Sequence, residues 1–321
     1  MSPNPSASAP GEPPAPEYSF SRYLTAKRTV DDRALNKDVV ERLRRELPTA
    51  AADPIRVVEL GAGLGTMAAR LVDWGVVRRA TYVLLEMDAE LLAEGRRYLA
   101  TWARERGHLL EERSSALWVT GANGLELRIE PRCAKLEDYL AAHADFGRVD
   151  LLVASAFLDL VDLRVTTPRL VAGARAPSLF WFSINFDGET LFEPPHPHDG
   201  ALLAVYHRSM DERVRDGHPA GDSRSGRHLF GHLQSAGAEV LAAGASDWLV
   251  WPTAGRYPGD EAHFLHHLIH TIDAELVQHA DVDRAHLADW VALRHAQVDR
   301  GELVFVAHQL DFLGRPGNAK P

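Results

Sequence analysis

The residues best suited to ligand chemistry lie in the stretch VVELGAGLGT, residues 57–66, where an acidic residue precedes three glycines at alternate positions. Gly61, Gly63 and Gly65 follow an apolar strand pattern and precede a helical pattern. Glycine permits a tight strand-to-helix turn and lets a ligand approach the backbone closely. The stretch therefore predicts a nucleotide-type ligand at the end of a strand.

A second acidic residue, Glu86, ends the next predicted strand. An acid at this place in a strand–helix–strand unit accepts hydrogen bonds from both hydroxyls of a ribose. This pair of features fits NAD and S-adenosylmethionine (SAM) equally.

The glycine spacing and Glu59 favour SAM. The dinucleotide fingerprint is G-x-G-x-x-G, whereas this turn reads G-x-G-x-G. A pyrophosphate at the helix N-terminus would also lie near the negative charge of Glu59. SAM has no phosphate and carries an ammonium and a sulfonium. Two opposite unit charges about 4 Å apart attract by roughly 4 kcal/mol at an effective dielectric constant of about 20.

Strand and helix patterns alternate along the chain on both sides of this turn, and the elements they predict would hold the turn in place. This alternation predicts an α/β fold whose sheet is mostly parallel. Strands are expected at 55–60, 81–86, 116–130 (two strands around a turn), 148–155, 178–185 and 301–313, and helices at 66–74, 89–106, 261–279 and 284–300.

Several motifs, in this order, resemble those of the class I SAM-dependent methyltransferases. VVELGAGLGT resembles their motif I, and YVLLEMD resembles their ribose-binding motif. RVDLLVASAFLDLVD resembles their fourth-strand motif, and GELVFVAHQLDFLG their antiparallel seventh strand. The resemblance covers about residues 50–313 and implies a doubly wound, mostly parallel seven-stranded sheet with an antiparallel last strand and helices on both faces.

The resemblance also implies the cofactor site. Glu59, Gly61 and Gly63 would lie near the methionine part of SAM, and Glu86 or Asp88 would hold the ribose. Ser155 and Ala156 would line the reactive end of the cofactor. The full set of expected cofactor neighbours is Glu59, Gly61, Ala62, Gly63, Gly65, Glu86, Met87, Asp88, Ser155 and Ala156.

Polar residues after the fourth and fifth strands are the candidates for substrate chemistry, because ligands bind beyond the carboxyl ends of such strands. The predicted catalytic residues are Asp159, Asn185 and His207; His228 and His308 are further candidates for a general base, since histidine titrates near neutral pH. The predicted substrate-binding residues are Tyr23, Asp187, Tyr206, Arg224, Arg227 and His228.

The chain is expected to have three parts. Residues 1–17, rich in Pro, Ser and Ala, are predicted to be a disordered tail. Residues 18–48 would form an N-terminal helical cap, with a helix from Arg33 to Leu47 that has Asp32 as its N-cap. Residues 49–321 would form the SAM-binding domain, with a loop insertion on the substrate side at about 186–226.

The composition limits the classes of partner that the protein is expected to bind. The net charge of −10 argues against sequence-independent binding of nucleic acid, and a single cysteine excludes an intrachain disulfide. A secretory signal and a membrane-spanning run are not recognisable in the sequence, so a cytoplasmic protein is expected. His196, His198 and Asp199 lie close together, but the pattern lacks further ligands and no metal is predicted.

The sequence thus favours a SAM-dependent methyltransferase that acts on a small-molecule acceptor. Two alternatives remain: an NAD(P)-dependent oxidoreductase, and a non-catalytic SAM-binding sensor or partner subunit. The identity of the acceptor atom and the oligomeric state are open at this point.

Overall fold

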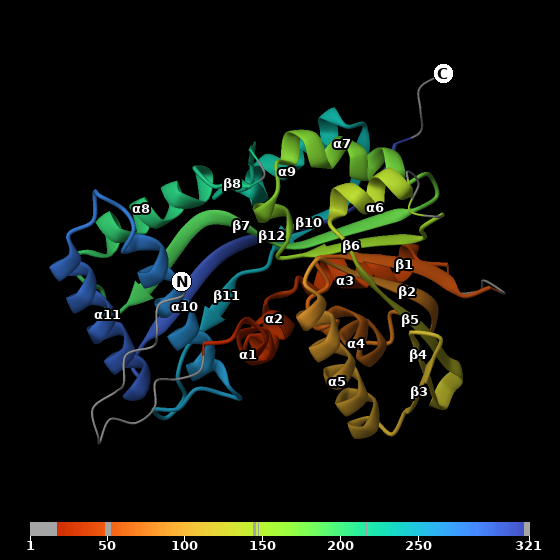
Figure 1. Ribbon diagram of the computed structural model, residues 1–321, viewed down its shortest axis with the longest axis horizontal. Helices are drawn as coiled ribbons and strands as arrows, with labels where there is room; N and C mark the ends of the chain where they lie inside the picture. The colour runs from red at the N-terminus through yellow and green to blue at the C-terminus, as the bar shows by residue number, and fades with distance from the viewer. Residues whose placement is uncertain (1–17, 49–52, 144–145, 147, 216, 318–321) are drawn as a thin grey trace, which may run out of the picture.

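The computed structural model describes residues 18–48, 53–143, 146, 148–215 and 217–317, so the predicted tail lies outside the described residues. At its centre is one sheet that has ten strands within these ranges (Figure 1). Seven of them follow the order β10 (Ala238–Ala245), β12 (Val304–Pro316), β7 (Leu179–Glu193), β6 (Leu151–Ser155), β1 (Ile55–Leu60), β2 (Arg79–Glu86) and β5 (Leu125–Cys133).

The strand directions confirm the predicted fold class. Strands β7, β6, β1, β2 and β5 pair in parallel, whereas β12 is antiparallel to both of its neighbours, β7 and β10. This is the mostly parallel sheet with an antiparallel last strand that the sequence led us to expect.

Three further strands complete the sheet, and the two strands expected at 116–130 are β4 (Ala116–Gly121) and β5. Strands β3 (Leu109–Arg113) and β4 add an antiparallel hairpin beside β5, and β11 (Trp248–Val250) pairs with β12. Strand β3 escaped prediction because it lies at the sheet edge and is half-buried at most, so its sequence lacks an apolar pattern.

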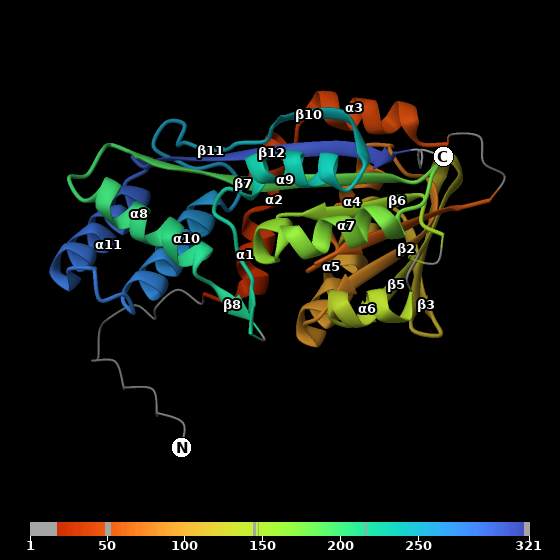
Figure 2. The ribbon, with the colours of Figure 1, turned by 90° about the horizontal axis from the view of Figure 1, so that it is seen from above.

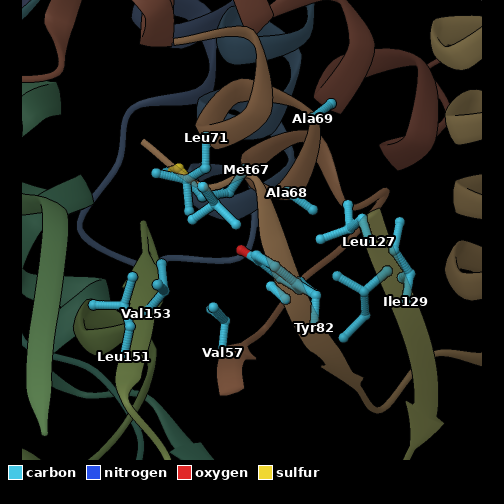
Figure 3. Packing of buried hydrophobic residues seen from close by; sticks show 14 of the residues in the cluster. Val57, Met67, Ala68, Ala69, Leu71, Tyr82, Leu127, Ile129, Leu151 and Val153 are labelled. Atoms are coloured by element: carbon cyan, nitrogen blue, oxygen red, sulfur yellow. The ribbon is translucent and has the colours of Figure 1, made fainter. Parts of the chain in front are cut away.

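Helices cover both faces of the sheet (Figure 2). One apolar cluster joins the strands to α3 (Lys37–Glu46), α4 (Thr66–Asp73) and α5 (Ala89–Glu105), and a second joins them to α6 (Leu136–Ala142), α7 (Leu163–Gly173) and α9 (Ser225–Ser235). Figure 3 shows part of the first cluster, in which Val57 and Tyr82 on the strands pack with Met67 and Leu71 on α4.

A third apolar cluster fills the part of the molecule where β7 and β12 extend beyond the parallel strands (Figure 1). There Phe192, Phe305 and Val250 of the sheet pack under helices. These helices are α1 (Phe20–Ala26), α2 (Arg28–Ala34), α8 (Asp199–Asp211), α10 (Glu261–Leu276) and α11 (Arg284–Asp299).

Segment 186–226 is more regular than the predicted loop. It contains the end of β7, helix α8 and a short hairpin of β8 (Val214–Arg215) and β9 (His218–Pro219). Strand β7 continues to Glu193 because its last residues pair with β12, which lies more than a hundred positions later in the chain. Such a distant pairing leaves no local signal in the sequence.

The predicted helix from Arg33 to Leu47 is confirmed from Lys37 to Glu46, but its start is wrong. Leu35 has an extended backbone that separates α2 from α3. Asn36, and not Asp32, is the N-cap of α3, and its side-chain oxygen accepts hydrogen bonds from Asp38 N and Val39 N.

Candidate functional site

The glycine turn connects β1 to α4 at the carboxyl edge of the sheet. Gly61, Gly63 and Gly65 all have positive φ, at 62°, 53° and 75°. This left-handed backbone is costly for residues with a Cβ, so the three glycines are required by the turn itself. Gly65 is also the N-cap of α4, so the turn ends where the helix dipole begins.

Two side chains lie directly against the turn. A Cβ at Gly61 would collide with the ring of Phe157, and a Cβ at Gly63 would lie 3.0 Å from Cδ1 of Leu24. Phe157 follows β6 and Leu24 belongs to α1, so two distant segments meet over the glycines. The close approach that glycine permits is therefore used here by the protein's own side chains.

Glu86 reaches the turn from the end of β2. Its Oε2 accepts a hydrogen bond from Gly63 N at 3.0 Å, and its Oε1 accepts from Met87 N at 2.8 Å and Asp88 N at 3.1 Å. The carboxylate is thereby held between the two βα connections, with one lone pair of Oε2 remaining for a ligand hydroxyl.

Glu59 lies behind the turn and is almost completely buried, at 3% exposure. Tyr82 donates a hydrogen bond to its Oε2 at 2.9 Å, and within the described residues Glu59 forms no ion pair; the nearby Arg70 instead pairs with Asp31 and Asp32. Burial raises the pKa of Glu59 to about 8, against the opposing effects of Tyr82 and Arg70. A cation brought beside Glu59 would favour its charged form.

The residues next to Glu86 have different roles. Asp88 caps α5 by accepting hydrogen bonds from Glu90 N and Leu91 N, which leaves Glu86 as the better candidate for a ribose. Met87 is 51% exposed, and its carbonyl accepts a hydrogen bond from the exposed Cys133 at 3.6 Å.

The end of β6 contributes Ser155, Ala156 and Asp159. Ala156 has a positive φ of 49°, and its N–H donates to Ser183 O at 2.9 Å. This bend leads the chain over the carboxyl ends of the strands and into the 3-10 turn Leu158–Leu160. Asp159 in this turn has a buried Oδ1 that has no hydrogen-bond partner among the described residues.

Tyr23 and Tyr206 approach from α1 and α8. The ring of Tyr23 stacks on His267 at 4.5 Å and on Phe264 at 5.6 Å. Burial raises the pKa of both tyrosines, that of Tyr206 to about 12, and the charge of Asp159 raises both further. These two predicted substrate residues therefore lie in the electrostatic neighbourhood of Asp159.

The other two predicted catalytic residues are placed elsewhere. Asn185 is fully buried inside the sheet, where its Nδ2 donates to Phe182 O and Leu310 O. His207 packs on Phe186 and hydrogen-bonds Thr190 Oγ1 at 3.0 Å, and burial lowers its pKa. Neither contacts the residues around the glycine turn.

The remaining predicted substrate residues form surface ion pairs near the start of α9. Arg227 Nε donates to Asp187 Oδ1 at 2.8 Å, and His228 Nδ1 lies 2.7 Å from Asp222 Oδ2. Arg224 N donates to Asp222 as well, and its side chain is exposed. His308 bonds Asp247 at 2.8 Å. The side chains of Arg227, His228 and His308 are therefore each paired with a carboxylate.

The stretch with His196 and His198 has a structural explanation. Both carboxylate oxygens of Asp199 accept hydrogen bonds from the fully buried Arg294, and Trp290 donates to the same carboxylate. Across the described ranges, no group of three or more His, Cys, Asp or Glu side chains has the arrangement of a metal site.

Lys27, in the same N-terminal stretch as Tyr23, is a further residue near Asp159. It is 9% exposed, its Nζ lies 3.5 Å from Asp31 Oδ2 and 5.2 Å from the centre of the Trp248 ring, and its charge acts on Asp159. Lys27 follows Tyr23 at i+4 and thus lies on the same face of the α1–α2 segment.

Two cavities lie away from this site. One is bordered by Val77, Arg78 and Leu125, and the other by Pro54, Asp150 and Ser178. Both groups are at the amino ends of strands, opposite the edge at which ligands bind in such sheets. Among the described residues there is also no helix of the length and apolarity that a membrane span requires.

The strand order and directions define the class of fold: a doubly wound α/β fold whose mostly parallel sheet has an antiparallel last long strand, as the resemblance in the sequence implied. No protein-family model and no curated protein matches the sequence.

Solved structures of similar fold include methyltransferases. A SAM-dependent methyltransferase from Thiobacillus denitrificans, in complex with S-adenosyl-L-homocysteine, is 12% identical with a TM-score of 0.44, covering 92% of this chain and 97% of that one. Geranyl diphosphate C-methyltransferase from Streptomyces coelicolor A3(2) is 12% identical with a TM-score of 0.40, covering 86% and 76%. The cyclase SpnF is 14% identical with a TM-score of 0.38, covering 87% and 81%. At such low similarity, activity and ligand must be argued from the residues of this chain.

Proposed function

We propose that this protein is a SAM-dependent methyltransferase that acts on a small molecule. The observation that carries the proposal is Glu59, a buried carboxylate beside the glycine turn that forms no ion pair within the described residues. A ligand with an ammonium group supplies the missing opposite charge. The pyrophosphate of NAD would instead bring negative charge toward Glu59 and Glu86, which disfavours an oxidoreductase.

The chain's own residues would bind and orient the ligands. Bound SAM would supply an electrophilic methyl group. Glu86 would accept hydrogen bonds from the ribose hydroxyls, Met87 would contact the adenine, and Ser155 and Ala156 would border the reactive end. Methyl transfer needs close and aligned reactants above all, so these positioning contacts would be the main contribution of the protein.

We also propose that residues 18–48 act as a cap over the cofactor. Support comes from Leu24 of α1, which lies against Gly63, and from Tyr23 and Lys27, which approach Asp159. Ligand entry would require Leu24 and Phe157 to move away from the glycines. The net charge of −10 supports a small acceptor over nucleic acid.

Isothermal titration calorimetry with SAM, S-adenosylhomocysteine and NAD tests the proposal. We expect binding of the first two and none of NAD, and weaker binding by Glu59→Gln. Absence of SAM and S-adenosylhomocysteine binding at high micromolar concentration by the folded protein would overturn the proposal, and NAD binding would favour the oxidoreductase. Tight S-adenosylhomocysteine binding without SAM consumption in the presence of amines, carboxylic acids or phenols would favour the non-catalytic sensor.

A further inference from the structure

The side chain of Asp159 has an unmet requirement for a hydrogen-bond donor. Its Oδ1 is shielded from solvent and has no partner among the described residues. The backbone of the same residue is satisfied, since its carbonyl accepts from Asp222 N at 3.3 Å. A buried acceptor without a donor is rare in folded proteins and requires an explanation, such as a ligand that completes the bond.

The position of Asp159 matches that of an acceptor-binding group. It follows β6 in the 3-10 turn that contacts β7 and α9, and the preceding Phe157 packs on Gly61. Asp159 is thereby linked through one short segment to the glycine turn, at the carboxyl edge where ligands of this fold bind.

Cations near Asp159 do not satisfy it. Lys27 and Arg213 are close enough for their charges to act on the carboxylate, yet within the described residues neither forms an ion pair with it. Lys27 is already paired with Asp31, and Asp222 adds a further negative charge nearby. The charged groups around Asp159 therefore leave a net negative charge, which one more cation would neutralise.

The surroundings are also suited to an ammonium group. The ammonium of Lys27 lies 5.8 Å from the ring centre of Tyr23 and 5.2 Å from that of Trp248, although it is 9% exposed. Ring faces together with a carboxylate stabilise cations in such places. Tyr206, whose side chain is 9% exposed, adds another ring to this neighbourhood.

We propose that Asp159 is the acceptor-binding carboxylate of this protein and that the small-molecule substrate presents an amine to it. The inference rests on the proposed function and adds the chemical class of the acceptor. An ammonium supplies both a donor and a positive charge, whereas a neutral hydroxyl supplies only the donor. Before methyl transfer, one ammonium proton would pass to the Asp159 carboxylate and free the lone pair of the nitrogen. The nitrogen would then bond to the methyl carbon of SAM as the bond from that carbon to sulfur breaks, with S-adenosylhomocysteine as the leaving group.

Sinefungin provides the test. This SAM analogue carries an amine-bearing carbon in place of the sulfonium and its methyl, so its ammonium marks the place where an acceptor nitrogen meets the cofactor. We expect the wild-type protein to bind sinefungin about tenfold or more tightly than S-adenosylhomocysteine, since a charge-assisted hydrogen bond has about this effect. In Asp159→Asn the two ligands should bind with nearly equal affinity.

Asp162→Asn is the matched control. Asp162 caps α7 and pairs with Arg164, and asparagine is an equally good cap, so this variant should keep the preference for sinefungin. Circular dichroism verifies folding, and Asp159→Ser replaces Asp159→Asn if the latter does not fold. An unchanged preference in the Asp159 variants, or none in the wild type, overturns the inference. Failure of S-adenosylhomocysteine itself to bind instead overturns the proposed function.

Discussion

The phenolic oxygen of Tyr82 lies 2.9 Å from Oε2 of Glu59, and both side chains are buried where β1 and β2 pair in parallel. The hydroxyl is a neutral donor, so it stabilises the carboxylate only in part. Burial therefore dominates and raises the pKa of Glu59 to about 8. Without a ligand, Glu59 is therefore favoured in its neutral form up to about pH 8, and a cation placed beside it would favour the charged form. Strongly raised pKa values of this kind are typical of functional sites.

Glu59→Gln should stabilise the ligand-free protein and weaken cofactor binding. The folded protein binds the Glu59 proton more tightly than the unfolded chain, so the free energy of unfolding of the wild type should fall, relative to the variant, as pH rises from 4.5 to about 8. One pKa unit corresponds to about 1.4 kcal/mol, which gives an upper limit of about 5 kcal/mol over this interval. Urea unfolding of both proteins at several pH values measures the difference. A pH-independent difference would contradict it.

Glu86→Gln should weaken S-adenosylhomocysteine binding by about tenfold to a hundredfold, because hydrogen bonds to a charged carboxylate contribute roughly 1.5–3 kcal/mol. Asp88→Asn is the control, since asparagine can accept the same capping bonds from Glu90 N and Leu91 N. Calorimetry with each variant gives the two affinities. Equal losses in both variants would show that the ribose is not held by Glu86 specifically.

Gly61→Ala should destabilise the protein by more than Gly75→Ala. Both glycines have positive φ, at 62° and 66°, so both substitutions carry a backbone cost of about 1 kcal/mol. Only Gly61 has the ring of Phe157 where the Cβ would lie, whereas the space at Gly75 is open. Urea unfolding should show a loss about 1–3 kcal/mol larger for Gly61→Ala.

The double variant Gly61→Ala with Phe157→Ala distinguishes the cost of the collision with the Phe157 ring from the backbone cost of positive φ. Its Gly61→Ala step should cost no more than Gly75→Ala does, because the colliding ring is gone. A Gly61→Ala step that costs as much without Phe157 as with it would mean that the collision is relieved by other movements.

Arg33→Ala should loosen the N-terminal segment. Arg33 pairs with Glu261, whose side chain is fully buried, and also donates to Leu249 O at 3.2 Å. Loss of the pair leaves Glu261 without its cation and should cost about 2–4 kcal/mol, nearer the lower end because Arg33 is partly exposed. Hydrogen exchange should then increase in α1 and α2 before it increases in β1 and β2.

Arg22→Ala serves as the comparison for Arg33→Ala. The Arg22–Asp260 pair is exposed on both sides, at 43% and 42%, so its loss should change stability by no more than about 0.5 kcal/mol. Uniform exchange changes across the whole sheet in Arg33→Ala would argue that residues 18–48 do not move as a separate cap.

The sequence predicted best those helices and strands whose apolar residues repeat regularly along the chain. Apolar runs and helical periodicity located β1, β2, β6, α4, α5, α10 and α11 to within a few residues, because side-chain burial on one face repeats with the geometry of each element. The glycines at 61, 63 and 65 identified the turn for the same reason: the backbone at a positive φ demands a residue without a Cβ. Glu86 ends β2, as the sequence predicted, and its role toward a ribose stays a prediction.

Only the tertiary structure decided which side chains meet. Asn185 and His207 had suitable chemistry, but sheet pairing and helix packing direct them to backbone carbonyls and to Thr190. Lys27 and Asp159 come together although they are far apart in sequence, because α1 packs against the glycine turn at the carboxyl edge of the sheet. Contacts of this kind depend on chain segments that fold onto one another, and no periodicity along the chain records them.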